Sequence, residues 1–296
     1  MGNFFWWCES VELTSRPRRG NFPAMHFPKF WVRARRGAVA AWGWSDSSEA
    51  DALAEGEHRL TALLSRLAEG NRDRRGAYGY PDRPLREQVV REFFDANGFL
   101  SAAVTRNRQG CLILNTAGAV FVDADKPTPS LWQSLSRVWR PRKDFVPEQI
   151  ERVQRWVEVQ PEVGWRVYET KAGLRLLATH TRETPDGELC RAAFAAFGVD
   201  PLYQRLCATQ KSFRARLTPK PWRCGLKCPT VRWPWGTEEA RANFEAWDIP
   251  YRTASQEFAT CRLLGQFGNP EIAKDLRDLV AFHDQTTGAE TGRPLA

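Results

Sequence analysis

Two aspartates one residue apart close an apolar run at residues 118–127, which reads GAVFVDADKP. If the run is a β-strand, positions two apart point to the same face, so Asp123 and Asp125 project together. Two carboxylates this close repel each other, and a bound cation relieves the repulsion. Mg²⁺ and Mn²⁺ suit such hard oxygen ligands. The pattern therefore predicts either a solvated strand end or a divalent-metal site.

Two later stretches carry further residues of this kind. The first, ETKAGLRLL at 169–177, predicts a tight turn at 171–173 followed by a strand that contains Arg175. The second, VDPLYQRLCATQKSFRARLTPK at 199–220, offers an aspartate and a tyrosine, then Phe-Arg and a lysine. The residues of that stretch that could take part in chemistry are Asp200, Tyr203, Phe213, Arg214, Arg216 and Lys220.

With these stretches in order, the chain resembles the archaeo-eukaryotic primase superfamily over about residues 99–223, most closely its primase-polymerase members. The resemblance implies metal-dependent nucleotidyl transfer on a nucleic-acid template. It implies that Mg²⁺ or Mn²⁺ is held by Asp123, Asp125 and Asp200, and that the triphosphate is held by Arg214, Arg216 and Lys220. The partners it implies are nucleoside triphosphates and a single-stranded or primed template. Phrases such as WGWSDSS also resemble a widespread bacterial family, which implies no particular function.

The sequence departs from the family pattern at one position. The family has Ser-x-His on the strand after the turn, whereas this chain has Arg175 there and no histidine. A guanidinium can still bind phosphate, so Arg175 joins the predicted nucleotide-binding residues, but it does not titrate near neutral pH. Strand alternation places the nearby His180 on the opposite face. Two alternatives therefore stay open: a nucleic-acid- or nucleotide-binding protein with a vestigial site, and a metal-dependent phosphohydrolase.

The charge of the chain is compatible with a nucleic-acid partner. Lysine and arginine together number 43 against 35 acidic residues, and several arginines lie beside aromatic residues, as in VWRPRK at 138–143 and PWRC at 221–224. Guanidinium groups bind phosphates, and aromatic rings stack on bases. Arginine-rich proteins can also be basic without binding nucleic acid, so charge alone does not decide.

The remaining composition bounds the class of protein. The apolar content of 42% is typical of a globular chain, and no run approaches the ~20 apolar residues of a membrane helix. Because the first residues lack a secretory signal pattern, we expect a cytoplasmic protein without a membrane partner. The seven cysteines suggest no disulfide framework. Cys224 and Cys228 could supply two zinc ligands, but reduced structural thiols fit better.

Periodicity gives the expected elements. We expect strands at 30–45 around a turn, a helix capped within 46–48 and extending to about 68, a polar loop at 69–82, and a second helix starting at Pro84. Strands at 101–107, 111–116 and 119–125, a helix around 147–159 and a hairpin over 165–180 follow. Together they predict an α+β fold: a primase-like core with a mixed or antiparallel sheet at 99–296 and an N-terminal α/β lobe at 1–98.

Overall fold

The computed structural model describes residues 25–69, 84–126 and 145–296. Within these ranges the chain is an α+β protein whose strands all pair in antiparallel ladders, as the sequence predicts. Most of the loop expected at 69–82 and the basic stretch at 138–143 lie outside the described residues. No helix in the described part combines the length and the apolar character that a membrane crossing requires.

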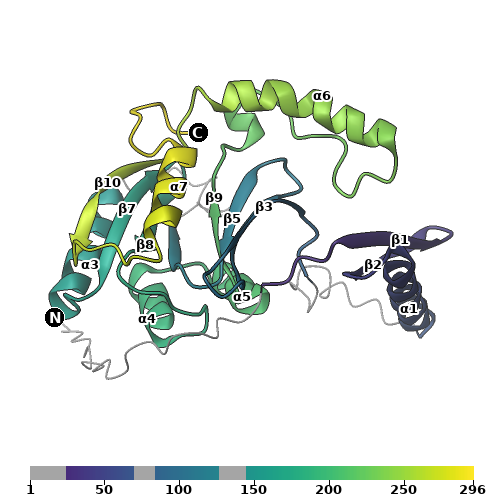
Figure 1. The fold of residues 1–296 in the computed structure, drawn as a ribbon, viewed down its shortest axis with the longest axis horizontal. Coiled ribbons are helices and arrows are strands. Elements are labelled where there is room, and N and C mark those ends of the chain that lie inside the picture. Colours follow the sequence, from purple (N-terminus) through teal and green to yellow (C-terminus); the bar gives the residue numbers. More distant parts are fainter. Residues whose placement is uncertain (1–24, 70–83, 127–144) are drawn as a thin grey trace, which may run out of the picture.

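The first described unit is a hairpin covered by a helix, and it lies at one end of the molecule (Figure 1). Its elements are β1 (Phe30–Arg36), β2 (Val39–Ser45) and α1 (Glu49–Ala68). Ser48 caps the helix by accepting a hydrogen bond from the Asp51 backbone N–H, which satisfies one of the free donors at a helix start. The helix packs closely on the hairpin because Gly43 and Gly56 face each other without side chains. Both expected strands and the helix are thus confirmed.

A four-stranded antiparallel sheet follows, in the order β3-β4-β5-β9. Its strands are β3 (Gln88–Phe94), β4 (Leu100–Arg106), β5 (Leu112–Thr116) and β9 (Phe213–Arg216). The helix predicted to start at Pro84 is wrong, because residues 88–94 form β3. The apolar positions there fit helical spacing, but Val89, Val90 and Phe93 are residue types that favour strands, and β4 supplies the backbone partners. The domain boundary expected after residue 98 falls in the turn between β3 and β4.

The second four-stranded sheet has the order β10-β7-β8-β6 and carries the aspartate pair. Its strands are β6 (Phe121–Asp125), β7 (Gly164–Thr170), β8 (Gly173–Ala178) and β10 (Cys261–Gly268). The hairpin predicted from residue 165 onward is confirmed as β7 and β8. The other elements are α3 (Phe145–Val159), α4 (Glu188–Phe197), α5 (Pro201–Gln210), the short helix η2 (Pro221–Cys224), α6 (Glu238–Ser255) and α7 (Arg277–Thr287).

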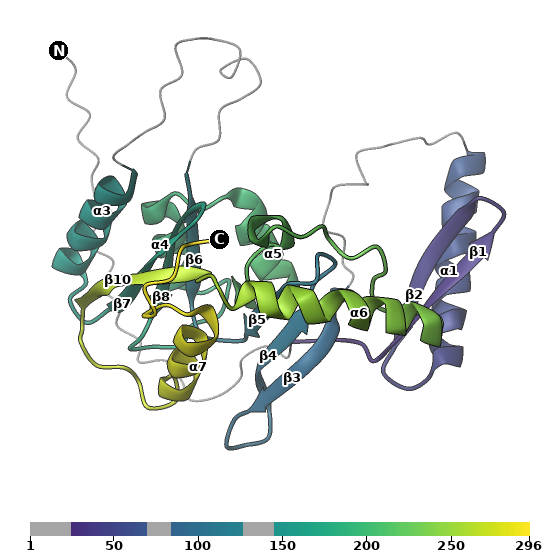
Figure 2. The ribbon, with the colours of Figure 1, turned by 90° about the horizontal axis from the view of Figure 1, so that it is seen from above.

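The main core lies around the second sheet, between α3 and α4 on one side and α7 on the other (Figure 2). Its largest fully buried side chains include Phe121, Trp165, Tyr168 and Phe197. The two sheets meet where β6 approaches β9. There the Tyr203 hydroxyl of α5 lies 3.1 Å from the carbonyl oxygens of both Phe121 and Arg214. One tyrosine thus joins the two strands that carry the predicted site.

The contact between β8 and β6 next to the aspartates tolerates no side chain at Gly173. A Cβ built there would lie 2.0 Å from the Ala124 carbonyl oxygen. We expect Gly173→Ala to lower the free energy of unfolding by about 1–3 kcal/mol, because the strands must move apart. Urea denaturation measures this. Gly236→Ala is the control. A Cβ at that position would meet no neighbouring atom within 4 Å, so the free energy of unfolding should change by no more than about 0.5 kcal/mol. Equal stabilities would contradict the strand contact.

Candidate functional site

The aspartate pair lies at the end of β6, on the face expected from strand alternation. Asp125 is exposed, and the Asp123 side chain is 30% exposed. In the ladder with β8, Asp123 stands opposite Arg175 and Asp125 opposite Gly173. The surrounding protein and the nearby charge of Asp123 raise the pKa of Asp125 above its usual value. The two carboxylates therefore act on each other, as the sequence predicts.

Arg175 is buried and bonded to Asp123 through both carboxylate oxygens. Its Nε donates to Oδ1 at 2.9 Å and its Nη2 to Oδ2 at 3.5 Å, while its Nη1 donates to the Arg216 carbonyl oxygen at 2.9 Å. The Arg175 side chain is only 3% exposed. Burial by itself would lower the pKa of Arg175, but the Asp123 carboxylate outweighs it, so the pKa is raised and the guanidinium stays charged. Arg175, which the sequence predicts to bind phosphate, thus donates its hydrogen bonds to groups of the protein itself.

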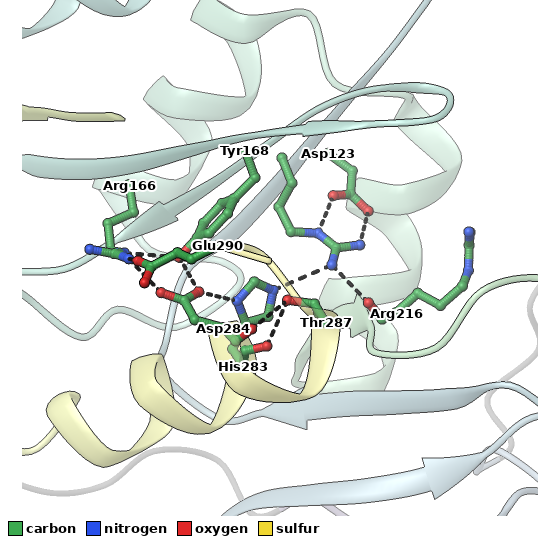
Figure 3. A network of polar contacts seen from close by, with 9 residues as sticks. Asp123, Arg166, Tyr168, Arg216, His283, Asp284, Thr287 and Glu290 are labelled. Atoms are coloured by element: carbon green, nitrogen blue, oxygen red, sulfur yellow. Dashed lines mark hydrogen bonds and ion pairs between the residues drawn. The ribbon is translucent and has the colours of Figure 1, made fainter. Parts of the chain in front are cut away.

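A network of polar side chains continues from Arg175 into the core (Figure 3). His283 of α7 is fully buried, and its Nε2 lies 3.5 Å from Arg175 Nη1. Its Nδ1 lies 2.9 Å from Asp284 Oδ1, which also accepts from the Tyr168 hydroxyl at 2.7 Å. Burial lowers the pKa of His283. A neutral ring that donates from Nδ1 to Asp284 presents Nε2 as an acceptor to Arg175.

The far end of this network is a second ion pair. Arg166 Nη2 contacts Asp284 Oδ2 and, at 3.0 Å, Glu290 Oε1. No pattern in the sequence connects His283 to the aspartates. In the structure, His283 contacts Arg175, which in turn binds Asp123. The only signal in the sequence was a histidine followed directly by an aspartate, which is too common a pair to indicate a site.

Asp200, the third predicted carboxylate, caps the start of α5. Its side chain accepts from the Leu202 backbone N–H at 2.8 Å. The charge of Asp200 contributes to the raised pKa of Asp125, so the two lie near each other. However, no group of three or more His, Cys, Asp or Glu side chains among the described residues is arranged to hold a metal ion. The donors fit one ion held by Asp123 and Asp125 together with ligand phosphates, which Mg²⁺ accepts. They do not form a cage for two ions.

Arg214 is paired within the protein. Its Nη2 donates to Glu87 Oε1 at 2.8 Å and Oε2 at 3.0 Å, and its Nη1 to Asn115 Oδ1 at 2.7 Å. Both members of the ion pair are about nine-tenths buried, with side-chain exposures of 11% and 10%. Asn115 in turn donates to the Thr105 hydroxyl at 2.9 Å. Arg214 therefore links β9, β5 and the segment before β3.

Arg216 and Lys220 have no such partner. Together with Arg223 they form a cationic cluster, and no described carboxylate makes an ion pair with any of the three. Burial, reinforced by the charge of Arg175, lowers the pKa of Arg216. Burial and then the charges of Arg216 and Arg223 lower the pKa of Lys220. Both side chains act electrostatically on Asp125. The clustered positive charges attract an anion, and the neighbouring carboxylates favour an anion that carries a bound cation.

Two further predictions can be located. His180 accepts a hydrogen bond from the Gly164 backbone N–H at 3.0 Å, beyond the far end of β8, so it does not face Asp123. Cys224 and Cys228 are free and partly buried. Because the described part of the chain contains no set of three metal-ligating side chains, nothing completes a zinc site around them there.

No family model, curated protein or solved structure matches the chain. The resemblance to primases over residues 99–223 therefore stays a prediction.

The different surroundings of Arg214 and Arg216 predict different effects of the same substitution. Arg214→Ala should lower the free energy of unfolding by about 3–5 kcal/mol, because it leaves the Glu87 carboxylate buried without its partner. Arg216→Ala should change it by less than about 1 kcal/mol, since it removes a charge that has no ion pair. Denaturant unfolding of the two variants measures both. If Arg216→Ala destabilised the protein more than Arg214→Ala, the assignment of Arg214 as the ion-paired arginine would be wrong.

The carboxylate pair predicts metal binding with a defined pH dependence. Calorimetry with Mn²⁺ should show binding that Asp123→Asn or Asp125→Asn weakens at least about 10-fold. Since the metal binds the ionised carboxylate and the pKa of Asp125 is raised, affinity should begin to fall at a higher pH than an aspartate with the usual pKa would give. Asp278→Asn, at an exposed position on α7, is the control. Mn²⁺ binding that is unchanged in both site variants would exclude the site.

Proposed function

We propose that the protein is a divergent primase-polymerase-like protein that binds a nucleoside triphosphate with Mg²⁺ or Mn²⁺ at the end of β6. We further propose that it transfers the nucleotidyl group on a nucleic-acid template. The observation that carries this proposal is that Arg216 and Lys220 lie close enough to Asp125 to interact with its charge, with Arg223 next to both cations. A triphosphate with a divalent ion matches both halves: its oxygens suit the cations, and its metal suits the carboxylates.

The contacts of each residue define its role in this proposal. Asp125 would provide the free carboxylate for the ion, because Asp123 shares its oxygens with Arg175. The ion supplies positive charge to the phosphates when bound. Arg216 and Lys220 would hold the phosphates and offset the charge that develops during transfer. Half of the Trp222 indole is exposed, and the Lys220 ammonium lies 5.2 Å from its ring, so an aromatic face is available beside the cations for a base.

A specific observation favours a second candidate, a nucleotide-binding protein that does not polymerise. Both oxygens of Asp123 accept from the buried Arg175 guanidinium, which leaves this carboxylate less free for a metal. In two-metal phosphoryl transfer, one ion activates the attacking hydroxyl and the other the leaving group. The donor set around Asp125 fits only one. The metal-dependent phosphohydrolase, with water as nucleophile, would use the same carboxylates and is an outcome of the same assay.

The test has two parts, nucleotide binding and primer extension. Deoxynucleoside triphosphate affinity in Mn²⁺ should fall about 10-fold or more in Arg216→Ala and in Lys220→Ala, because each loses a charge-assisted contact with the phosphates. Higher salt should weaken binding by the wild type. Arg155→Ala, at an exposed arginine of α3, should bind like the wild type. A labelled primer on a template should be extended, and Asp125→Asn should abolish the extension.

The outcomes separate the candidates. Binding that depends on Arg216 without any extension on several templates would establish the non-catalytic protein. Release of phosphate from the nucleotide without extension would establish the phosphohydrolase. If the Arg216 and Lys220 variants bind nucleotide as tightly as the wild type, the proposed function is refuted.

A further inference from the structure

A cavity whose lining includes neither of the aspartates lies between the C-terminal ends of α6 and α7. It has a volume of about 300 Å³ and is walled on one side by Thr218 and Pro219. This volume is at the lower end of the range of about 300–1,000 Å³ that is usual for small-molecule sites. The buried Cys111 lies next to both the cavity and the cationic cluster: its thiol contacts the Pro219 carbonyl oxygen and interacts with Arg216 and with Tyr251, which lines the cavity.

Among the described residues, three arginines and no carboxylate line this cavity. Arg106 and Arg252 share one acid, Asp248: Arg106 Nη1 lies 2.8 Å from Oδ1, and Arg252 Nε lies 3.2 Å from Oδ2. The third, Arg293, is exposed and makes no ion pair with a described residue. Two of the three positive charges are therefore not balanced locally, although the Asp248 carboxylate is nearly buried. A cavity with this surplus favours an anionic ligand.

The rest of the lining is suited to a ring rather than to a bare anion. Leu112, Pro219 and the half-buried Phe258 offer apolar surface, while the side-chain amides of Gln256 and Gln285 can donate and accept hydrogen bonds. Sites for small ligands combine such apolar walls with a few polar groups that fix orientation. The lining thus joins phosphate-binding groups to groups that suit a nucleobase.

We propose that this cavity binds a mononucleotide, with its phosphate on Arg293 and Arg252 and its base between the apolar wall and the glutamine amides. This site is separate from the proposed nucleotidyl-transfer site and uses none of its residues. It contains no carboxylate that could hold a metal with the phosphate. Binding here is therefore independent of divalent ions.

The experiment is calorimetric titration of the full chain with AMP in the presence of a chelator. AMP should bind, and Arg293→Glu should weaken it by about 10- to 100-fold, because the variant replaces a charge-assisted contact with repulsion. Arg252→Ala should weaken it as well. Arg108→Glu, the same charge reversal in the exposed turn between β4 and β5, should leave it unchanged. Arg216→Ala should also leave it unchanged, which distinguishes this cavity from the site at β6.

Comparison of ligands tests the second half of the proposal. AMP should bind more tightly than ribose 5-phosphate, and inorganic phosphate should bind least. Equal affinity for phosphate and AMP would overturn the assignment to a nucleotide. Arg293-dependent binding of a single-stranded oligonucleotide without binding of AMP would overturn it in favour of a nucleic-acid strand. AMP binding that survives Arg293→Glu and Arg252→Ala would overturn the site itself.

Discussion

A single buried guanidinium organises the centre of this protein. Arg175 on β8 reaches Asp123 on β6, the carbonyl oxygen of Arg216 on β9, and His283 on α7. Burying a cation costs free energy unless its hydrogen-bond donors are satisfied, so Arg175 needs all three of these partners in place. The arrangement of both sheets and of the helix that carries His283 is thus tied to one side chain.

This constraint shapes the chemistry that the neighbouring residues can perform. Asp123 is partly neutralised by Arg175, whereas Asp125 remains exposed with a raised pKa. Two arginines on the same strand differ in their contacts: Arg214 forms an ion pair with Glu87, whereas Arg216 forms none with the residues that the structure describes. The proposed site therefore offers one available carboxylate beside a group of cations, and the proposal of a phosphate ligand with a single metal ion fits these groups better than one with two metal ions.

Local patterns in the sequence predicted the elements well but not the contacts between distant residues. Alternation identified β6 and the β7–β8 hairpin, and the polar residues at 46–48 indicated where α1 is capped, because these signals lie within a few residues. The apolar spacing of residues 88–94 fits a helix as well as a strand, so the helix predicted there is wrong. Only the pairing with β4 decides between the two. The contact of Arg175 with His283 spans 108 positions in the sequence, so no local pattern could have indicated it.

The hydroxyl of Tyr203 has a further consequence. It lies between the carbonyl oxygens of Phe121 on β6 and Arg214 on β9, so one oxygen atom acts as the spacer between the two sheets. Asp123 and Asp125 belong to β6 of one sheet, and Arg216 belongs to β9 of the other. The separation of β6 and β9 at this contact is therefore set by an aromatic side chain anchored in α5. The proposed ligand, held by Asp125 and Arg216 together, would join the two sheets a second time, so ligand binding and the Tyr203 contacts would resist the same separation of the sheets.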